Sequence, residues 1–241
     1  EVMVNAHLLR LDVGIFVLHM VLTAVFVVAP FALVETLGLE RDSHWQVYVP
    51  VLVGSILLMA PLLILGMRRE RTFWVFRSAI FIVLVGQCVL FAGANQVISL
   101  IAGLVCFFVG FNLLEAMLPS LMTRLSPGYA KGTAIGVYNT FEFAGVFVGG
   151  ALGGILLGLF GSPGVFAFCV LATLVWLVVA STGRTPQLRN SVTLRLDGEF
   201  DLASGSIEHS LGALNGVDEV TVLPKDCVAY LRVEETCFDP K

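Results

Sequence analysis

The stretch Gly132–Gly161, GTAIGVYNTFEFAGVFVGGALGGILLGLFG, decides the fold. It is almost wholly apolar and longer than the ~20 residues that a helix needs to cross a bilayer. Interior glycine costs a helix in water about 0.5–1 kcal/mol relative to alanine, but in lipid it lets a neighbouring helix approach closely. The stretch therefore predicts a membrane helix with a packing stripe. Six glycines, mostly three or four residues apart, form that stripe: Gly136, Gly145, Gly149, Gly150, Gly153 and Gly154.

The composition places most of the chain in a membrane. Hydrophobic residues make up 57% of its 241 residues and charged residues 13%, against about 25% charged in an average soluble domain. The chain has no basic patch with interleaved aromatic residues, so a nucleic-acid partner is not predicted.

Apolar runs long enough to cross a bilayer recur along the chain with brief connections, which predicts an all-α membrane bundle of six antiparallel transmembrane helices. The predicted spans are residues 13–34, 47–65, 73–92, 97–118, 135–159 and 165–180.

Basic residues predict the orientation of the bundle, because cytoplasmic loops carry an excess of Lys and Arg. One side of the six spans carries Arg41 alone. The other side carries nine basic residues: Arg10, Arg68, Arg69, Arg71, Arg77, Arg124, Lys131, Arg184 and Arg189. We therefore expect an integral protein of the plasma (bacterial inner) membrane with both termini in the cytoplasm.

The tail differs in character from the rest, which predicts a bundle over residues 1–183, a linker over 184–190 and a small domain over 191–241. Residues 191–197 alternate like a strand, and residues 202–214 have helical spacing with Gly216 as a stop signal. Two further strands follow at 219–223 and 227–233. This βαββ order is the first part of a ferredoxin-like α+β unit, so we expect an incomplete ferredoxin-like domain.

The five cysteines are scattered and include no C-x-x-C pair: Cys88, Cys106, Cys169, Cys227 and Cys237. We expect structural thiols, without a disulfide framework, metal site or cofactor.

Two carboxylates inside predicted spans are candidates for function, because an ionisable group in a membrane is costly and functional by default. Glu142 lies within the glycine-rich span with Asn139 one turn before it, and Glu115 follows Asn112 by one turn in the preceding span. Desolvation favours the neutral form of a carboxylic acid, which suits proton-coupled export. A hydrogen bond between the two helices is the structural alternative.

The first span adds His19 and, seven residues earlier, Asp12 on nearly the same helix face. Histidine titrates near neutral pH, so His19 is a candidate for a proton step. A buried, hydrogen-bonded histidine and an Asp12–Arg10 pair are the structural alternatives.

Two glycine-containing motifs resemble those of the major facilitator superfamily. The order Gly66-x-x-x-Glu70-Arg71 is similar to the start of that superfamily's cytoplasmic loop motif, G-x-x-x-(D/E)-R-x-G-(R/K)-(R/K), whose remainder is missing here. The spacing from Gly136 to Gly154 resembles its antiporter motif, G-x8-G-x3-G-P-x2-G-G, with Gly150 in place of proline. Both motifs fall at the loop and span positions that the family uses. The resemblance implies that Glu70 and Arg71 form a charge lock between transport states.

The degenerate loop motif and a fourth span without arginine resemble the C-terminal six-helix half of that twelve-helix family. The tail resembles the ferredoxin-like domain of its YajR-type drug-efflux members. The resemblance implies proton-coupled efflux of small molecules by alternating access, without covalent chemistry. It also implies an N-terminal six-helix half as partner. Two alternatives remain open: a membrane-anchored sensor whose tail binds a ligand or partner, and a half-size transporter that acts as a dimer.

Overall fold

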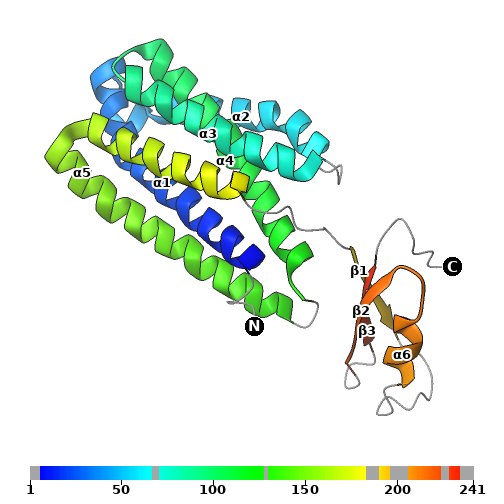
Figure 1. Cartoon of the computed structure of the whole chain (residues 1–241). Coiled ribbons are helices and arrows are strands. Elements are labelled where there is room, and N and C mark those ends of the chain that lie inside the picture. The colour runs from blue at the N-terminus through cyan, green and yellow to red at the C-terminus, as the bar shows by residue number, and fades with distance from the viewer. Residues whose placement is uncertain are drawn as a thin grey trace.

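A computed structural model describes residues 6–66, 71–127, 130–182, 190–195, 206–223 and 228–233. Its larger part is a helical bundle (Figure 1), in which five helices are long and apolar enough to cross a membrane. They are α1 (Ala6–Leu37), α2 (Trp45–Gly66), α3 (Thr72–Gly93), α4 (Val97–Leu125) and α5 (Lys131–Thr182), with a 3₁₀ turn, η2 (Arg41–Ser43), before α2. The first four contain the first four predicted spans.

Helix α5 contains both of the last two predicted spans. Its 52 residues would measure about 78 Å as a straight helix, more than twice the ~30 Å hydrocarbon core of a bilayer. The helix is broken at Gly161, whose φ of 66° and ψ of −170° are not helical. Figure 1 shows α5 folding back on itself. The parts of α5 before and after Gly161 are called its first and second arms. The backbone conformation at this residue is one that essentially only glycine adopts.

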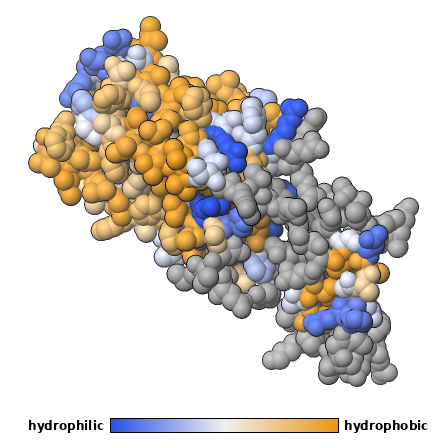
Figure 2. Space-filling model, viewed as in Figure 1, coloured by the Kyte–Doolittle hydropathy of each residue, from blue (hydrophilic) through white to orange (hydrophobic). Residues whose placement is uncertain are grey.

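The bundle consists of two closely packed pairs of helices. Helix α1 packs most extensively against α5, and α3 packs most extensively against α4, with α2 lying mainly on α4. The core between them is apolar, and its large, fully buried side chains include Leu8, Ile15, Ile80, Phe107 and Leu113. Figure 2 shows apolar side chains over most of the visible bundle surface, with polar residues gathered near its ends.

Three glycines bring α3 and α4 together, and the sequence analysis missed them. A Cβ added at Gly110 would lie 2.7 Å from the carbonyl oxygen of Ala79, and one added at Gly103 would lie 3.2 Å from that of Gly86. Close approach of helix backbones through small residues is the usual packing mode in lipid. Each helix contributes only one or two of these glycines, so no stripe was visible in the sequence.

The tail forms a three-stranded antiparallel sheet with one short helix. Its elements are β1 (Asn190–Arg195), α6 (Ser206–Gly212), β2 (Val217–Leu223) and β3 (Val228–Val233), and the sheet order is β1-β3-β2. Ala229 and Leu231 of β3 are fully buried. Gly216, the predicted stop signal, has a φ of 87° in the turn that leads into β2. The predicted βαββ order agrees with these elements.

Some predicted features lie outside the described residues: Glu70, nearly all of the 184–190 linker, Cys227 and Cys237. Among the described cysteines, Cys88, Cys106 and Cys169 are free thiols.

Candidate functional site

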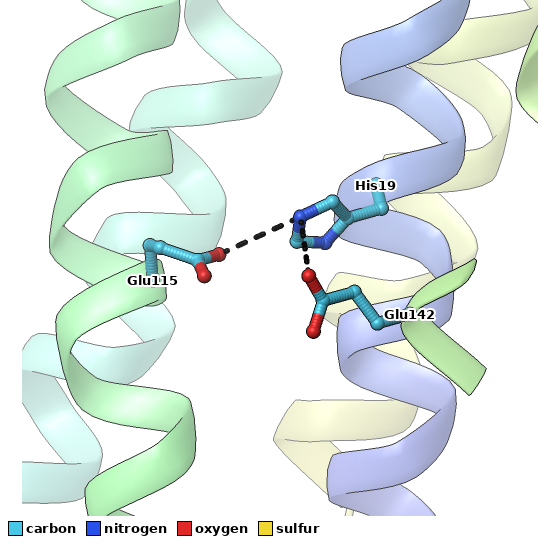
Figure 3. A group of neighbouring side chains, drawn as sticks. All are labelled: His19, Glu115 and Glu142. Carbon is cyan, nitrogen blue, oxygen red and sulfur yellow. Dashed lines mark ion pairs between the residues drawn. The ribbon is translucent and has the colours of Figure 1, made fainter. Parts of the chain in front are cut away.

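Three titratable side chains from three helices meet inside the bundle. The Nε2 atom of His19 on α1 lies 3.5 Å from Glu142 Oε1 on α5 and 3.9 Å from Glu115 Oε2 on α4. Figure 3 shows the imidazole ring pointing between the two carboxylates. The structure thus brings together three residues that the sequence singled out separately.

Glycines on α5 bring its backbone onto α1 near this cluster. A Cβ added at Gly145 would overlap the carbonyl oxygen of Phe16, and one added at Gly149 would overlap that of Met20. One turn further on, a Cβ at Gly153 would lie 3.1 Å from the Cα of Ala24. Gly145 follows Glu142 by three residues, and Phe16 precedes His19 by three. This close helix packing holds the carboxylate of Glu142 within reach of the imidazole.

The other three glycines of the predicted stripe do not contribute to this backbone contact. A Cβ at Gly150 would meet the Thr23 side chain at an ordinary 3.5 Å, and one at Gly136 or Gly154 would have no neighbour within 4 Å. The glycines of α5 that pack against α1 are therefore Gly145, Gly149 and Gly153, spaced at regular four-residue intervals.

The cluster is buried at its centre and open at one side. His19 is 8% exposed, whereas the side chains of Glu115 and Glu142 are 40% and 25% exposed. The ring of Phe111 packs edge-on against the imidazole, with centroids 5.8 Å apart. Neither Nδ1 of His19 nor Oε2 of Glu115 has a hydrogen-bond partner among the described residues. Both carboxylate side chains therefore lie nearer the surface of the bundle than the imidazole does.

A cluster of one imidazole and two carboxylates can pass a proton between a base and two acids. A protonated imidazole would balance one of the two carboxylates, and its proton could be shared with either. His and Glu are also side chains that bind metal ions, and one ligand atom from each of the three lies within 4.8 Å of the others.

Tyr138 is a neighbour of this cluster that the sequence analysis missed. It lies one turn before Glu142, is 3% exposed, and is close to Glu115, Glu142 and Asp12. Its hydroxyl and the Oδ1 atom of Asp12, which is 1% exposed, have no hydrogen-bond partner among the described residues. The position of Tyr138 four residues before Glu142 was a usable signal, because residues at that spacing share a helix face.

The two asparagines lie apart from the cluster. Asn112 donates a hydrogen bond of 2.9 Å from Nδ2 to Oγ of Ser55, which joins α4 to α2. Ser55 in turn donates to the carbonyl oxygen of Leu52 at 2.8 Å. Asn139 is exposed on α5.

The two described residues of the loop motif lie at helix ends. Gly66 ends α2, is buried, and accepts a 2.8 Å hydrogen bond from Oγ1 of Thr72. Arg71 is exposed immediately before α3.

Comparison with known proteins identifies the family. Residues 11–209 match the Major Facilitator Superfamily. The inner membrane transport protein YajR of Escherichia coli (strain K12) is 34% identical over 234 residues, which are 97% of this chain and 51% of that protein. An uncharacterized transporter of Buchnera aphidicola subsp. Schizaphis graminum is 31% identical over 175 residues, 72% of this chain and 44% of that one. This chain thus spans about half the length of the curated relatives it matches. It belongs to the major facilitator superfamily.

Proposed function

We propose that this chain is one half of a proton-coupled secondary transporter. The cluster of His19, Glu115 and Glu142 would bind and release the protons that drive transport. The observation that carries the proposal is the position of His19, which lies within 4 Å of carboxylates on two different helices. Because the family is one of transporters, the protein is not an enzyme, and these side chains bind and release rather than catalyse covalent steps.

The proposed coupling follows from how the helices pack. Glu142 is held to His19 by the backbone contact between α5 and α1, whereas Glu115 belongs to α4, which packs mainly with α3. A small shift of one helix pair against the other would lengthen the His19–Glu115 contact and leave the His19–Glu142 contact intact. Protonation of a carboxylate removes its attraction for the imidazolium and so favours the separated arrangement.

We also propose the membrane arrangement of this half. The two arms of α5 would count as separate spans, giving six in all, with the basic residues and both termini on the cytoplasmic side of the bacterial inner membrane. The chain would correspond to the C-terminal half, and a second six-helix bundle, from the same polypeptide or another chain, would complete a substrate cavity at the interface. The relatives named as transporters support this, with small molecules exported by alternating access as the proposed activity.

The tail is proposed to be a ferredoxin-like cytoplasmic domain. The sheet order β1-β3-β2 with antiparallel pairing supports this, since it is the order that the first three strands of a ferredoxin-like fold adopt. The alignment with YajR, which covers 97% of this chain, extends over most of the tail as well.

The test of coupling is Glu142→Gln in the full-length protein, with Glu40→Gln as the matched control. Glu40 is an exposed carboxylate outside the cluster. In inverted membrane vesicles, we expect pH-gradient-driven uptake of ethidium to fall at least tenfold in Glu142→Gln, because loss of a charge-assisted contact of about 1.5–3 kcal/mol corresponds to a factor of roughly 10 to 150. Uptake in Glu40→Gln should match the wild type. Equal pH-driven uptake in Glu142→Gln and the wild type would exclude the proposed coupling role.

A further inference from the structure

A cavity lies far from the His19 cluster. It has a volume of about 630 Å³ and lies where α1 and α3 end and α5 reverses at Gly161. Glu35, which lines it, follows His19 by sixteen residues on α1, or about 24 Å along a helix. The volume falls within the ~300–1,000 Å³ typical of small-molecule sites. This cavity is therefore large enough for a ligand of its own.

Aromatic rings from three helical segments line the cavity. Phe31 on α1 and Phe91 on α3 are 48% and 50% exposed, and Phe166 on the second arm of α5 is 2% exposed. The faces of aromatic rings carry negative electrostatic potential and attract organic cations. Two partly exposed phenylalanines at one cavity are thus suited to a cation with an apolar surface.

The charge around the cavity favours a cation as well. Glu35 is an exposed carboxylate, and the described lining contains no Lys or Arg. The C-terminal ends of α1, α3 and the first arm of α5 border the cavity, against two N-terminal ends, that of the second arm of α5 and that of α4, which begins two residues after the lining residue Asn95. Helix C-termini carry partial negative charge. The nearby cation of Arg41 belongs to η2 and does not line the cavity.

Local contacts hold the cavity walls in place. Oγ1 of Thr36 donates a 3.0 Å hydrogen bond to the carbonyl oxygen of Ala94, which joins the end of α1 to the segment after α3. Gly161 reverses α5 without an intervening loop. Because the walls are already ordered, binding a ligand costs less conformational entropy here than in a site that must form on binding.

We propose that this cavity binds a lipophilic organic cation, with the carboxylate of Glu35 as its counter-ion and Phe31 and Phe91 against its apolar surface. The proposal does not depend on proton coupling at the His19 cluster. Two occupants would have this chemistry: a free lipophilic cation and the ammonium headgroup of a phospholipid. Both carry a cationic centre with alkyl or aryl substituents.

The test uses tetraphenylphosphonium and its isosteric anion tetraphenylborate with the purified full-length protein in phospholipid-free detergent. We expect the cation to bind and Glu35→Gln to weaken its binding about threefold to fivefold, the loss expected from one partly exposed contact to a cation. Phe91→Leu should weaken it by a similar factor. Glu40→Gln, which removes an exposed carboxylate at the same end but outside the cavity, should leave binding unchanged.

Nanodiscs separate the two sources of the cation. If the lipid headgroup is the natural occupant, phosphatidylcholine should weaken tetraphenylphosphonium binding relative to phosphatidylglycerol, and the difference should vanish in Glu35→Gln. If a free cation is the occupant, a difference between the two lipids comes only from attraction of the cation to the anionic phosphatidylglycerol surface, and it should persist in Glu35→Gln. Equal binding of the cation and the anion, or equal loss in Glu35→Gln and Glu40→Gln, would overturn the proposal. Thermal melting of each variant checks its folding. If the wild-type protein binds the cation but shows no pH-driven transport, only the coupling proposal is contradicted.

Discussion

One methyl group added at Gly149 should push α5 away from α1. In the Gly149→Ala protein the new Cβ would lie 2.8 Å from the carbonyl carbon and the Cα of Met20, where ordinary contact begins at 3.4 Å. Because the carbonyl belongs to a helix backbone, it cannot rotate out of the way. The helices must then separate by roughly 1 Å, which forfeits a quarter to a half of the dispersion energy of the affected contacts.

A matched variant on the same helix isolates the free-energy cost of overpacking at Gly149. Alanine at Gly154 meets nothing within 4 Å, and both substitutions gain the same helix propensity of about 0.5–1 kcal/mol. The difference between Gly149→Ala and Gly154→Ala is therefore the overpacking cost alone, about 1–3 kcal/mol. The ~2–4 °C per kcal/mol of a 150–250-residue protein is an upper limit for the longer full-length protein, so Gly149→Ala should melt below Gly154→Ala by up to roughly 12 °C.

Thermal unfolding of the two purified full-length variants in the same detergent is the assay. Gly145→Ala should behave like Gly149→Ala, and its effect should reach the cluster by lengthening the 3.5 Å contact between His19 and Glu142. If Gly149→Ala melts at the same temperature as Gly154→Ala or above it, the backbone contact between α1 and α5 is not close-packed, and the argument for how Glu142 is positioned fails.

Three further substitutions test other contacts. Gly110→Ala would place a Cβ 2.7 Å from the carbonyl oxygen of Ala79, so we expect a loss of about 1–3 kcal/mol in the free energy of unfolding, seen as a lower melting temperature. Ser55→Ala removes the acceptor of the Asn112 amide and should cost about 0.6–1.7 kcal/mol, measured by a double-mutant cycle with Asn112→Ala. Phe107→Ala truncates a fully buried ring and should cost about 3–5 kcal/mol, measured by denaturant unfolding.

Each of these has a control elsewhere in the bundle. Gly54→Ala meets nothing within 4 Å and should not lower the melting temperature as Gly110→Ala does. Phe81, at 55% exposed, should tolerate alanine with a far smaller loss than Phe107. Additive energies in the Ser55–Asn112 cycle would show that this hydrogen bond does not stabilise the bundle.

Sequence periodicity and composition predicted the helices well, because lipid requires each span to satisfy its own backbone hydrogen bonds within an apolar run. The break in α5 was also visible as the Gly161–Gly164 connection between two runs. The glycines between α3 and α4 were not found, because seven-residue spacing with one or two glycines per helix resembles ordinary composition.

The candidate site was predicted residue by residue but not as a unit. Helical spacing paired Glu142 with Asn139 and His19 with Asp12, since it relates only residues on the same helix. The structure instead joins His19 to carboxylates on α4 and α5. Which helices become neighbours depends on packing between distant segments, and a single sequence does not specify that.

The reversal of α5 at Gly161 also has a consequence for biogenesis. The segment from Gly158 to Gly164 contains no charged residue, and the two arms have no polar loop between them that could be held outside the bilayer. The two arms would therefore enter the membrane together as a helical hairpin rather than one after the other. The basic residues that flank the hairpin would set the orientation of both arms at once, whereas the reversal between them depends on the backbone angles of Gly161.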